Sequence, residues 1–131
     1  MRSMRRLKQT RLRPFLIRPR TVTISTSSGS EGVPIISWGD PVTFYGEVWP
    51  ATSQRQVEQY GDRISGIQNM RIEGEYDIEV VGSAAVIVFE NATIKPGDGV
   101  HVYAAETDEP DYVVLSFTQY GPLRLEIEHR V

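Results

Sequence analysis

Several features that support catalysis or membrane insertion are missing from this sequence. None of its 131 residues is a cysteine, which excludes disulfide bonds, a thiol nucleophile and a cysteine-based metal site. No apolar run approaches the roughly 18 residues that span a bilayer, and the longest candidate, residues 83–89, has the length of a strand. Nucleophile-elbow, P-loop and dinucleotide-binding motifs are also absent. We therefore expect no enzyme, no cofactor and no membrane partner.

Metal ligands are equally scarce. The only two histidines, His101 and His129, are far apart in the sequence, whereas a zinc site needs more nitrogen ligands or an unusual set of carboxylates. We expect both histidines to be surface residues of strands. Four carboxylates flank two neighbouring turns but lack the regular spacing of a calcium loop; they are Asp98, Asp108, Glu109 and Asp111. We expect these to be solvated turn residues, with no bound metal.

Acidic residues are missing from the first twenty positions. That stretch holds eight of the 14 basic residues, so residues 21–131 carry six basic and all 17 acidic residues, a net charge of −11. Such asymmetry predicts a basic arm that contacts nucleic acid, a membrane surface or an acidic neighbour, and a solvated tail is the alternative. Pro14 and Pro19 argue against a long amphipathic transit helix. The arm residues expected to contact DNA or an acidic neighbour are Arg2, Arg5, Arg6, Arg11 and Arg13.

Short strands separated by Gly- and Pro-rich turns dominate the rest of the chain. In residues 21–26, Val22 and Ile24 alternate with hydroxyl residues, which predicts a half-buried strand. Further runs of the same kind follow to the end of the chain without a long helix. The sequence therefore predicts an all-β fold, a small β-barrel or sandwich, formed by one domain over residues 21–131.

One long segment, residues 50–71, interrupts this pattern. Connections between strands are usually two to five residues long, so an insertion of about twenty is typically functional or disordered. Residues 52–60 predict a short helix with Thr52 or Ser53 as N-cap and Gly61 after its last turn. The side chains expected to dock this helix on the body are Val57, Tyr60 and Ile64.

An acidic row follows the insertion. Residues 72–80 alternate apolar and acidic side chains, which predicts one strand with four carboxylates on the same face. These are Glu73, Glu75, Asp77 and Glu79. Like charges spaced roughly 6.6 Å apart along a strand need water or a basic partner nearby. The face is either solvated, a lining that keeps a polyanion from sticking, or a dock for a neighbour's basic arm.

Part of this pattern resembles a known family. The run Glu47-Val48-Trp49-Pro50, followed by Gln59-Tyr60-Gly61-Asp62-Arg63-Ile64 and Asn69-Met70, is similar to the head-closure, or stopper, proteins of long-tailed bacteriophages, often described as minor capsid or head–tail joining proteins. Asp98-Gly99-Val100 and Pro110-Asp111-Tyr112-Val113-Val114 agree with the same family. The resemblance covers residues 21–131 and leaves the basic first twenty residues outside it.

The resemblance implies a structural protein of the virion, assembled in the host cytoplasm. A small β domain would form a homo-oligomeric ring between portal and adaptor proteins above and tail proteins below, where a long loop helps to retain channel DNA. The residues expected in the subunit-contact or gating loop are Trp49, Tyr60, Gly61, Asp62, Arg63, Asn69 and Met70. Tyr60, Arg63 and Asn69 would act as structural anchors or inter-subunit partners, with packing inside one chain as the alternative. For Arg63, local ion pairs with Asp62 or Glu58 are an equally simple expectation.

A second hypothesis belongs to another class. A small nucleic-acid-binding β-barrel would use its basic arm to clamp phosphates, with affinity that falls steeply with salt. The acidic body and the lack of aromatics interleaved with basic residues argue against a basic binding face.

Overall fold

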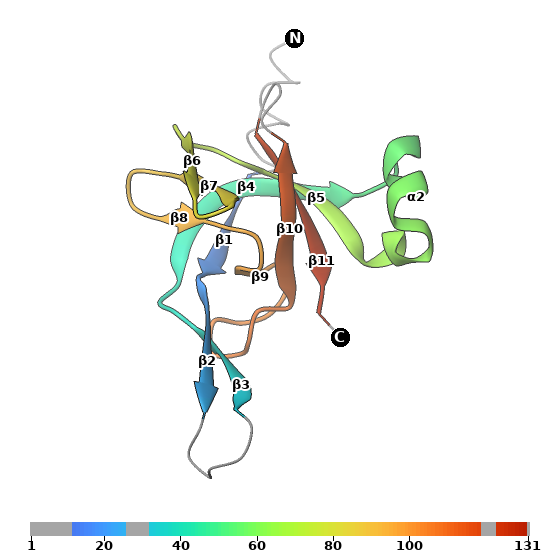
Figure 1. The fold of residues 1–131 in the computed structure, drawn as a ribbon. Coiled ribbons are helices and arrows are strands. Elements are labelled where there is room, and N and C mark those ends of the chain that lie inside the picture. The colour runs from blue at the N-terminus through green and yellow to red at the C-terminus, as the bar shows by residue number, and fades with distance from the viewer. Residues whose placement is uncertain (1–11, 26–31, 119–122, 131) are drawn as a thin grey trace.

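A computed structural model describes residues 12–25, 32–118 and 123–130. Its elements, in chain order, are β1 (Arg13–Arg18), β2 (Arg20–Ser25), β3 (Val33–Trp38), β4 (Val42–Pro50), α2 (Gln54–Tyr60), the 3₁₀ helix η1 (Gly61–Gly66), β5 (Ile67–Ile72), β6 (Asp77–Val81), β7 (Ala84–Val88), β8 (Thr93–Ile94), β9 (Gly99–His101), β10 (Tyr112–Thr118) and β11 (Arg124–His129). The predicted all-β fold is confirmed (Figure 1).

Six strands close into an antiparallel barrel in the order β1-β4-β5-β11-β10-β9. The barrel closes because β1 pairs with β4 on one side and with β9 on the other. Two smaller sheets extend from the barrel, the hairpin β2–β3 and the three-stranded sheet β6-β7-β8. In Figure 1 the hairpin β2–β3 projects from one end of the barrel and β6–β7 lies near the other.

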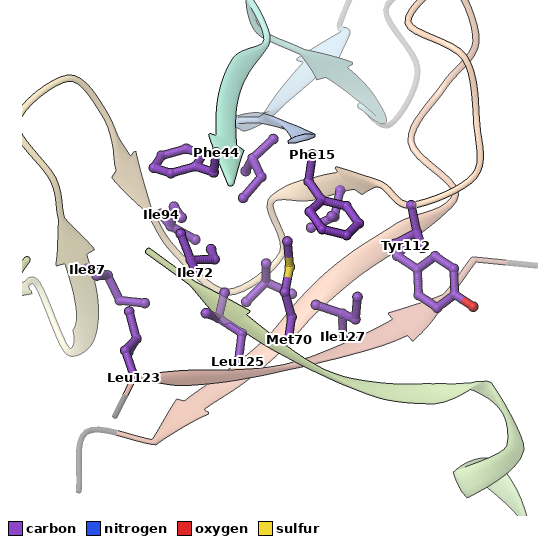
Figure 2. Close-up of a cluster of buried hydrophobic side chains, with 14 of the residues drawn as sticks. Phe15, Phe44, Met70, Ile72, Ile87, Ile94, Tyr112, Leu123, Leu125 and Ile127 are labelled. Atoms are coloured by element: carbon purple, nitrogen blue, oxygen red, sulfur yellow. The ribbon is translucent and has the colours of Figure 1, made fainter. Parts of the chain in front are cut away.

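Side chains that alternate along each strand point in turn into the barrel and out of it, and the inward ones fill its interior. On β4, Phe44 and Gly46 face inward while Thr43 and Tyr45 face outward, as the period of two requires. Gly46 has no space for a side chain, since a Cβ there would lie 2.0 Å from the backbone oxygen of Arg71. The interior side chains converge in Figure 2, with Ile87 and Ile94 reaching in from the three-stranded sheet.

The predicted arm is too long. Residues 13–18 form a barrel strand, whose Phe15 and Ile17 are 1% and 3% exposed. Phe15 and Ile17 alternate as in a strand, but the basic residues on either side led to the prediction of an arm instead. Residues 1–11, with Arg2, Arg5, Arg6 and Arg11, lie outside the described residues.

Two further strand predictions are wrong. Val22 and Ile24 are on a strand, but they are exposed rather than half-buried, because among the described strands β2 pairs with β3 alone. The predicted continuous strand 72–80 is divided: β5 ends at Ile72 and β6 begins at Asp77, with Gly74 at a φ of 131° between them. That backbone conformation favours glycine and breaks the ladder.

The insertion is also shorter than predicted. Of the segment 50–71, the last part belongs to barrel strand β5, and Pro50 is the last residue of β4. The helical segment α2–η1 (residues 54–66) therefore connects two neighbouring barrel strands, which pair with each other through Trp49 and Asn69. In Figure 1 it lies on the outside of the barrel, beside β5 and β11.

Candidate functional site

Local sequence signals explain why helix α2 forms. Ser53 is the N-cap: its hydroxyl accepts a hydrogen bond from the Gln56 backbone N–H, and the Gln56 side chain returns to the Ser53 backbone in a capping box. Gly61 ends the helix with a φ of 56°, and its N–H donates to the Val57 carbonyl. Both predicted caps, Ser53 and Gly61, are confirmed.

The face on which α2 docks is polar rather than apolar. Val57, the predicted apolar contact, is 48% exposed, while Gln56 is 3% exposed. The Gln56 amide donates to Asn69 Oδ1 at 2.7 Å and to Glu126 Oε2 at 2.8 Å. Tyr60 adds a hydrogen bond from its hydroxyl to Glu126 Oε1 at 2.8 Å. The helix is therefore attached to strands β5 and β11 by a buried polar cluster.

Strand register places this cluster on the outer barrel surface. Asn69 and Glu126 are directly paired across β5 and β11, and their neighbours Met70 and Leu125 point into the core. A register shift between Val114 and Ser116 in β10 brings Ser116 opposite Glu126. Such a bulge re-aims the side chains that follow it. As a result, the Ser116 hydroxyl donates to Glu126 Oε1 at 2.8 Å.

Glu126 is the centre of the polar cluster, which we define as Gln56, Tyr60, Asn69, Ser116 and Glu126. Burial by itself raises the pKa of the Glu126 carboxyl. Hydrogen bonds from Gln56, Ser116 and Tyr60, together with the nearby Arg124 charge, outweigh burial and lower that pKa below its ordinary value of 4.5. The cluster therefore favours an ionised Glu126. Burial and the contact with this carboxylate raise the pKa of the Tyr60 hydroxyl, which stays a donor.

Arg63 makes a second link between the helical segment and the barrel. Its Nε and Nη2 atoms donate to the two carboxylate oxygens of Glu128 at 3.0 and 2.8 Å. The expected partners Asp62 and Glu58 do not take this role, because the 3₁₀ turn directs Arg63 toward β11. Tyr60, Arg63 and Asn69 thus make contacts within one chain, the alternative that the sequence left open.

The other residues predicted for a contact loop are dispersed. Met70 is fully buried in the barrel core, so it is unavailable as a contact or gating residue. Asp62 and Gly61 are exposed where α2 is followed by η1. Trp49 is 37% exposed at the end of β4. It lines a groove with Arg13 and Tyr103, and it is the cross-strand partner of Asn69 in the polar cluster.

Arg13, predicted as an arm residue, belongs to the barrel. Its guanidinium lies 4.5 Å from the centroid of the Phe15 ring and 5.6 Å from that of Tyr103. At these distances a cation is attracted to the face of an aromatic ring. Arg13 therefore covers one end of the barrel and is held by aromatic contacts.

The four predicted acidic residues are all exposed, but they do not form one row. Only Asp77 and Glu79 lie on β6, and Glu73 and Glu75 precede it in the connection from β5. Two shallow grooves gather acidic side chains here, and both are lined by Glu75 and Glu90 together with the Phe89 ring. The acidic surface thus combines the segment 73–79 with Glu90, and Phe89 lines both grooves.

Two sequence predictions about histidines and turn carboxylates need correction. His101 is buried, and its Nε2 accepts a hydrogen bond from Arg18 at 3.1 Å, so it is not a surface residue. Asp98 is also buried. Its carboxylate accepts hydrogen bonds from the backbone N–H groups of Arg20 and Lys95, and it forms an ion pair with the Lys95 ammonium at 2.6 Å. These contacts replace the hydrogen bonds that water would make to the Asp98 carboxylate, so the residue can be buried. His129 is exposed, as predicted.

Among residues 12–25, 32–118 and 123–130, no group of three or more histidine or carboxylate side chains is placed to hold a metal ion. In the same part of the chain, neither helical element is long and apolar enough to cross a membrane.

Exposed apolar side chains are the feature that sequence analysis missed. Of the eleven large apolar side chains that are exposed in the described part of the chain, seven project from two hairpins. The hairpin β2–β3 carries Val22, Ile24, Val33, Ile35 and Ile36, and β6 carries Val80 and Val81. Alternation alone could not reveal them, because a strand with a covered face and a strand without one have the same pattern.

Comparisons with known proteins add no relative: no protein-family model, curated protein or solved structure matches the chain.

Proposed function

We propose that this protein is a non-enzymatic subunit of a phage head–tail connector, a stopper that forms a ring between head and tail and helps to retain DNA. The motif residues that resemble the stopper family support this proposal. Tyr60, Arg63 and Asn69 hold a helical segment against the outer barrel wall through Glu126 and Glu128. The proposed surroundings of the ring are the head–tail interface of a virion, with portal or adaptor proteins above and tail proteins below.

The observation that carries the proposal is the pair of apolar hairpins at separate ends of a closed barrel. Contiguous exposed apolar surface on a soluble protein commonly marks an interaction site. Val22, Ile24 and Ile36 share one face of the hairpin β2–β3, and Val80 and Val81 are exposed on β6. Exposed apolar side chains on two different parts of one chain suit heterologous contacts, which generate rings when the rotation closes. The helical segment is firmly attached by buried hydrogen bonds, so we assign it to subunit contact more readily than to a freely moving gate.

Electron microscopy and mass photometry test this function directly. The purified chain should form rings, alone or on a portal–adaptor complex, and density for it should lie between head and tail in the assembled particle. Monomers at all concentrations, with no association with a portal–adaptor complex, would contradict the proposal.

A second candidate is a nucleic-acid-binding barrel, favoured by the groove in which Arg13 lies beside Trp49 and Tyr103. Aromatic rings beside a cation are the usual platform for single-stranded nucleic acid. Removal of residues 1–11 tests it, since Arg13–Arg18 must stay to close the barrel. Loss of salt-sensitive DNA binding with unchanged assembly would favour this candidate, whereas assembly of a full chain that binds no DNA would favour the connector.

A further inference from the structure

Strands with a neighbour on one side alone lie in the two small sheets. Each of the six barrel strands has a neighbour on both sides, over part of its length where β9 pairs with β10, whereas β2 and β3 in one small sheet and β6 and β8 in the other each have one described neighbour. An unpaired edge presents a row of N–H and C=O groups to any strand that approaches. These four edges are therefore where another strand would add.

Two of the four edges, those of β2 and β6, are better suited than the others to pair with an added strand. β3 contains Pro34, which has no N–H to offer, and β8 has two residues. β2 and β6 have six and five residues without proline. They also carry exposed apolar side chains, Ile24 on β2 and Val80 on β6, that a paired strand would cover.

Charge distinguishes how these edges can pair. The charged residue of β2 is Arg20, while those of β6 are Asp77 and Glu79. Pairing β6 with another β6 would bring carboxylates together, which is unfavourable, whereas pairing β2 with β6 brings opposite charges together. Electrostatics therefore selects the mixed pair over the β6–β6 pair.

Geometry requires that the mixed pair join two molecules. β2 and β6 extend from separate ends of the barrel in Figure 1 and share no ladder within the chain. A contact from β2 of one copy to β6 of the next uses two different surfaces, so it repeats around an assembly and does not saturate in a dimer.

We infer that β2 of one copy adds to the β6 edge of a second copy, so that the sheet β6-β7-β8 continues into the hairpin β2–β3 of the neighbour. This inference rests on the proposed ring and names the strands that join its subunits. Main-chain hydrogen bonds would supply affinity, and the Arg20 contact with Asp77 or Glu79 would favour this pair over a β6–β6 pair.

Cysteine cross-linking tests the contact, and the chain is suited to it because it has no cysteine of its own. A parallel pair with Arg20 opposite Asp77 places Ile24 opposite Val81 and Thr23 opposite Val80. Ile24→Cys and Val81→Cys variants, one carrying a mass tag, are therefore oxidised separately and as a mixture, and Thr23→Cys and Val80→Cys are treated in the same way. Gln59→Cys, exposed on α2, is the control for random collision. A disulfide forms only when the two Cα atoms approach within about 7 Å.

The expected result is a tagged–untagged disulfide dimer in the mixture, well above the Gln59→Cys control, with little dimer from either variant alone. Dimers from Ile24→Cys alone would indicate hairpin-to-hairpin contact and overturn the inference. Rings seen by electron microscopy without the mixed disulfide would also contradict the pairing of β2 with β6, but they would still support the proposed function. Mixed disulfides in open filaments would support the contact between β2 and β6 while contradicting the ring. If no rings and no mixed disulfides form, both the contact and the proposed function are contradicted.

Charge exchange gives a second measurement that does not depend on oxidation. Arg20→Glu and Asp77→Arg should each weaken association by about two- to fivefold, the range for one cross-strand charge pair. The double variant should recover most of the loss. Glu58→Arg, exposed on α2, is the matched control. Additive losses in the double variant would contradict a direct contact between these strands.

Discussion

Glu126 is the residue on which the attachment of the helical segment most depends. Glu126→Ala would leave the hydroxyls of Tyr60 and Ser116 without their acceptor and the Gln56 amide with Asn69 as its remaining acceptor. We expect the free energy of unfolding to fall by about 1–3 kcal/mol, the cost of unsatisfied buried polar groups. Urea denaturation followed by circular dichroism measures the loss.

Glu128→Ala is the matched control for this prediction. It removes a carboxylate from the same strand, but its partner Arg63 is exposed, so the free energy of unfolding should change much less. Equal losses in the two variants would show that the buried cluster contributes no more than the surface pair.

The same carboxyl predicts how stability depends on pH. The pKa of Glu126 is lowered on folding, so its contribution is fully present above the unfolded pKa, near 4.5, and is lost as the pH falls through the lower folded value. The difference in unfolding free energy between the wild type and Glu126→Gln should therefore be constant from pH 7 to about pH 5 and shrink at lower pH. Urea midpoints at a series of pH values give this difference, and a constant difference down to pH 3 would contradict the prediction.

At the scale of elements, the hairpin β2–β3 is separable from the barrel. Thr21 and Ser37 are paired across it, so replacing residues 22–36 by Asn-Gly keeps a two-residue turn at that pair. Residues 22–24 and 32–36, whose burial the structure describes, are exposed, so the unfolding free energy of the barrel should change by less than about 1 kcal/mol. Assembly measured by mass photometry should be lost.

The control for this truncation is removal of exposed apolar character elsewhere, by Val57→Ser on α2. That variant should assemble as the wild type does. Rings formed by the truncated protein would show that the hairpin is dispensable for association.

Sequence reasoning succeeded where signals are local. The caps at Ser53 and Gly61 are set by residues within one helical turn, so the boundaries of α2 followed from the sequence. The docking of α2 did not, because Gln56 and Glu126 are 70 residues apart and neither has a distinctive local pattern. The bulge that turns Ser116 toward Glu126 is another non-local feature, visible only once β10 and β11 are in register.

At the scale of the whole molecule, closure of the barrel depends on β1. Removal of residues 1–18 would take Phe15 and Ile17 from the core and expose the edges of β4 and β9. A buried Phe alone is worth about 3–5 kcal/mol, a large part of the stability of a small domain. We expect this variant to be unfolded or aggregated by circular dichroism and size-exclusion chromatography.

Removal of residues 1–11 is the informative comparison, because it leaves β1 intact. That shorter deletion should retain the barrel and a cooperative thermal transition. A folded protein lacking residues 1–18 would contradict the role of β1 in closing the barrel.

The position of β1 also sets a time order for folding during synthesis. Arg18 is separated from His101, on the strand that closes the barrel, by 83 residues. At the usual rates of translation this interval lasts roughly 4–17 s, far longer than hairpin formation. During that time β1 has one partner, β4, and an open edge on its other side. Newly made chains are thus most vulnerable to mispairing with one another before β9 emerges.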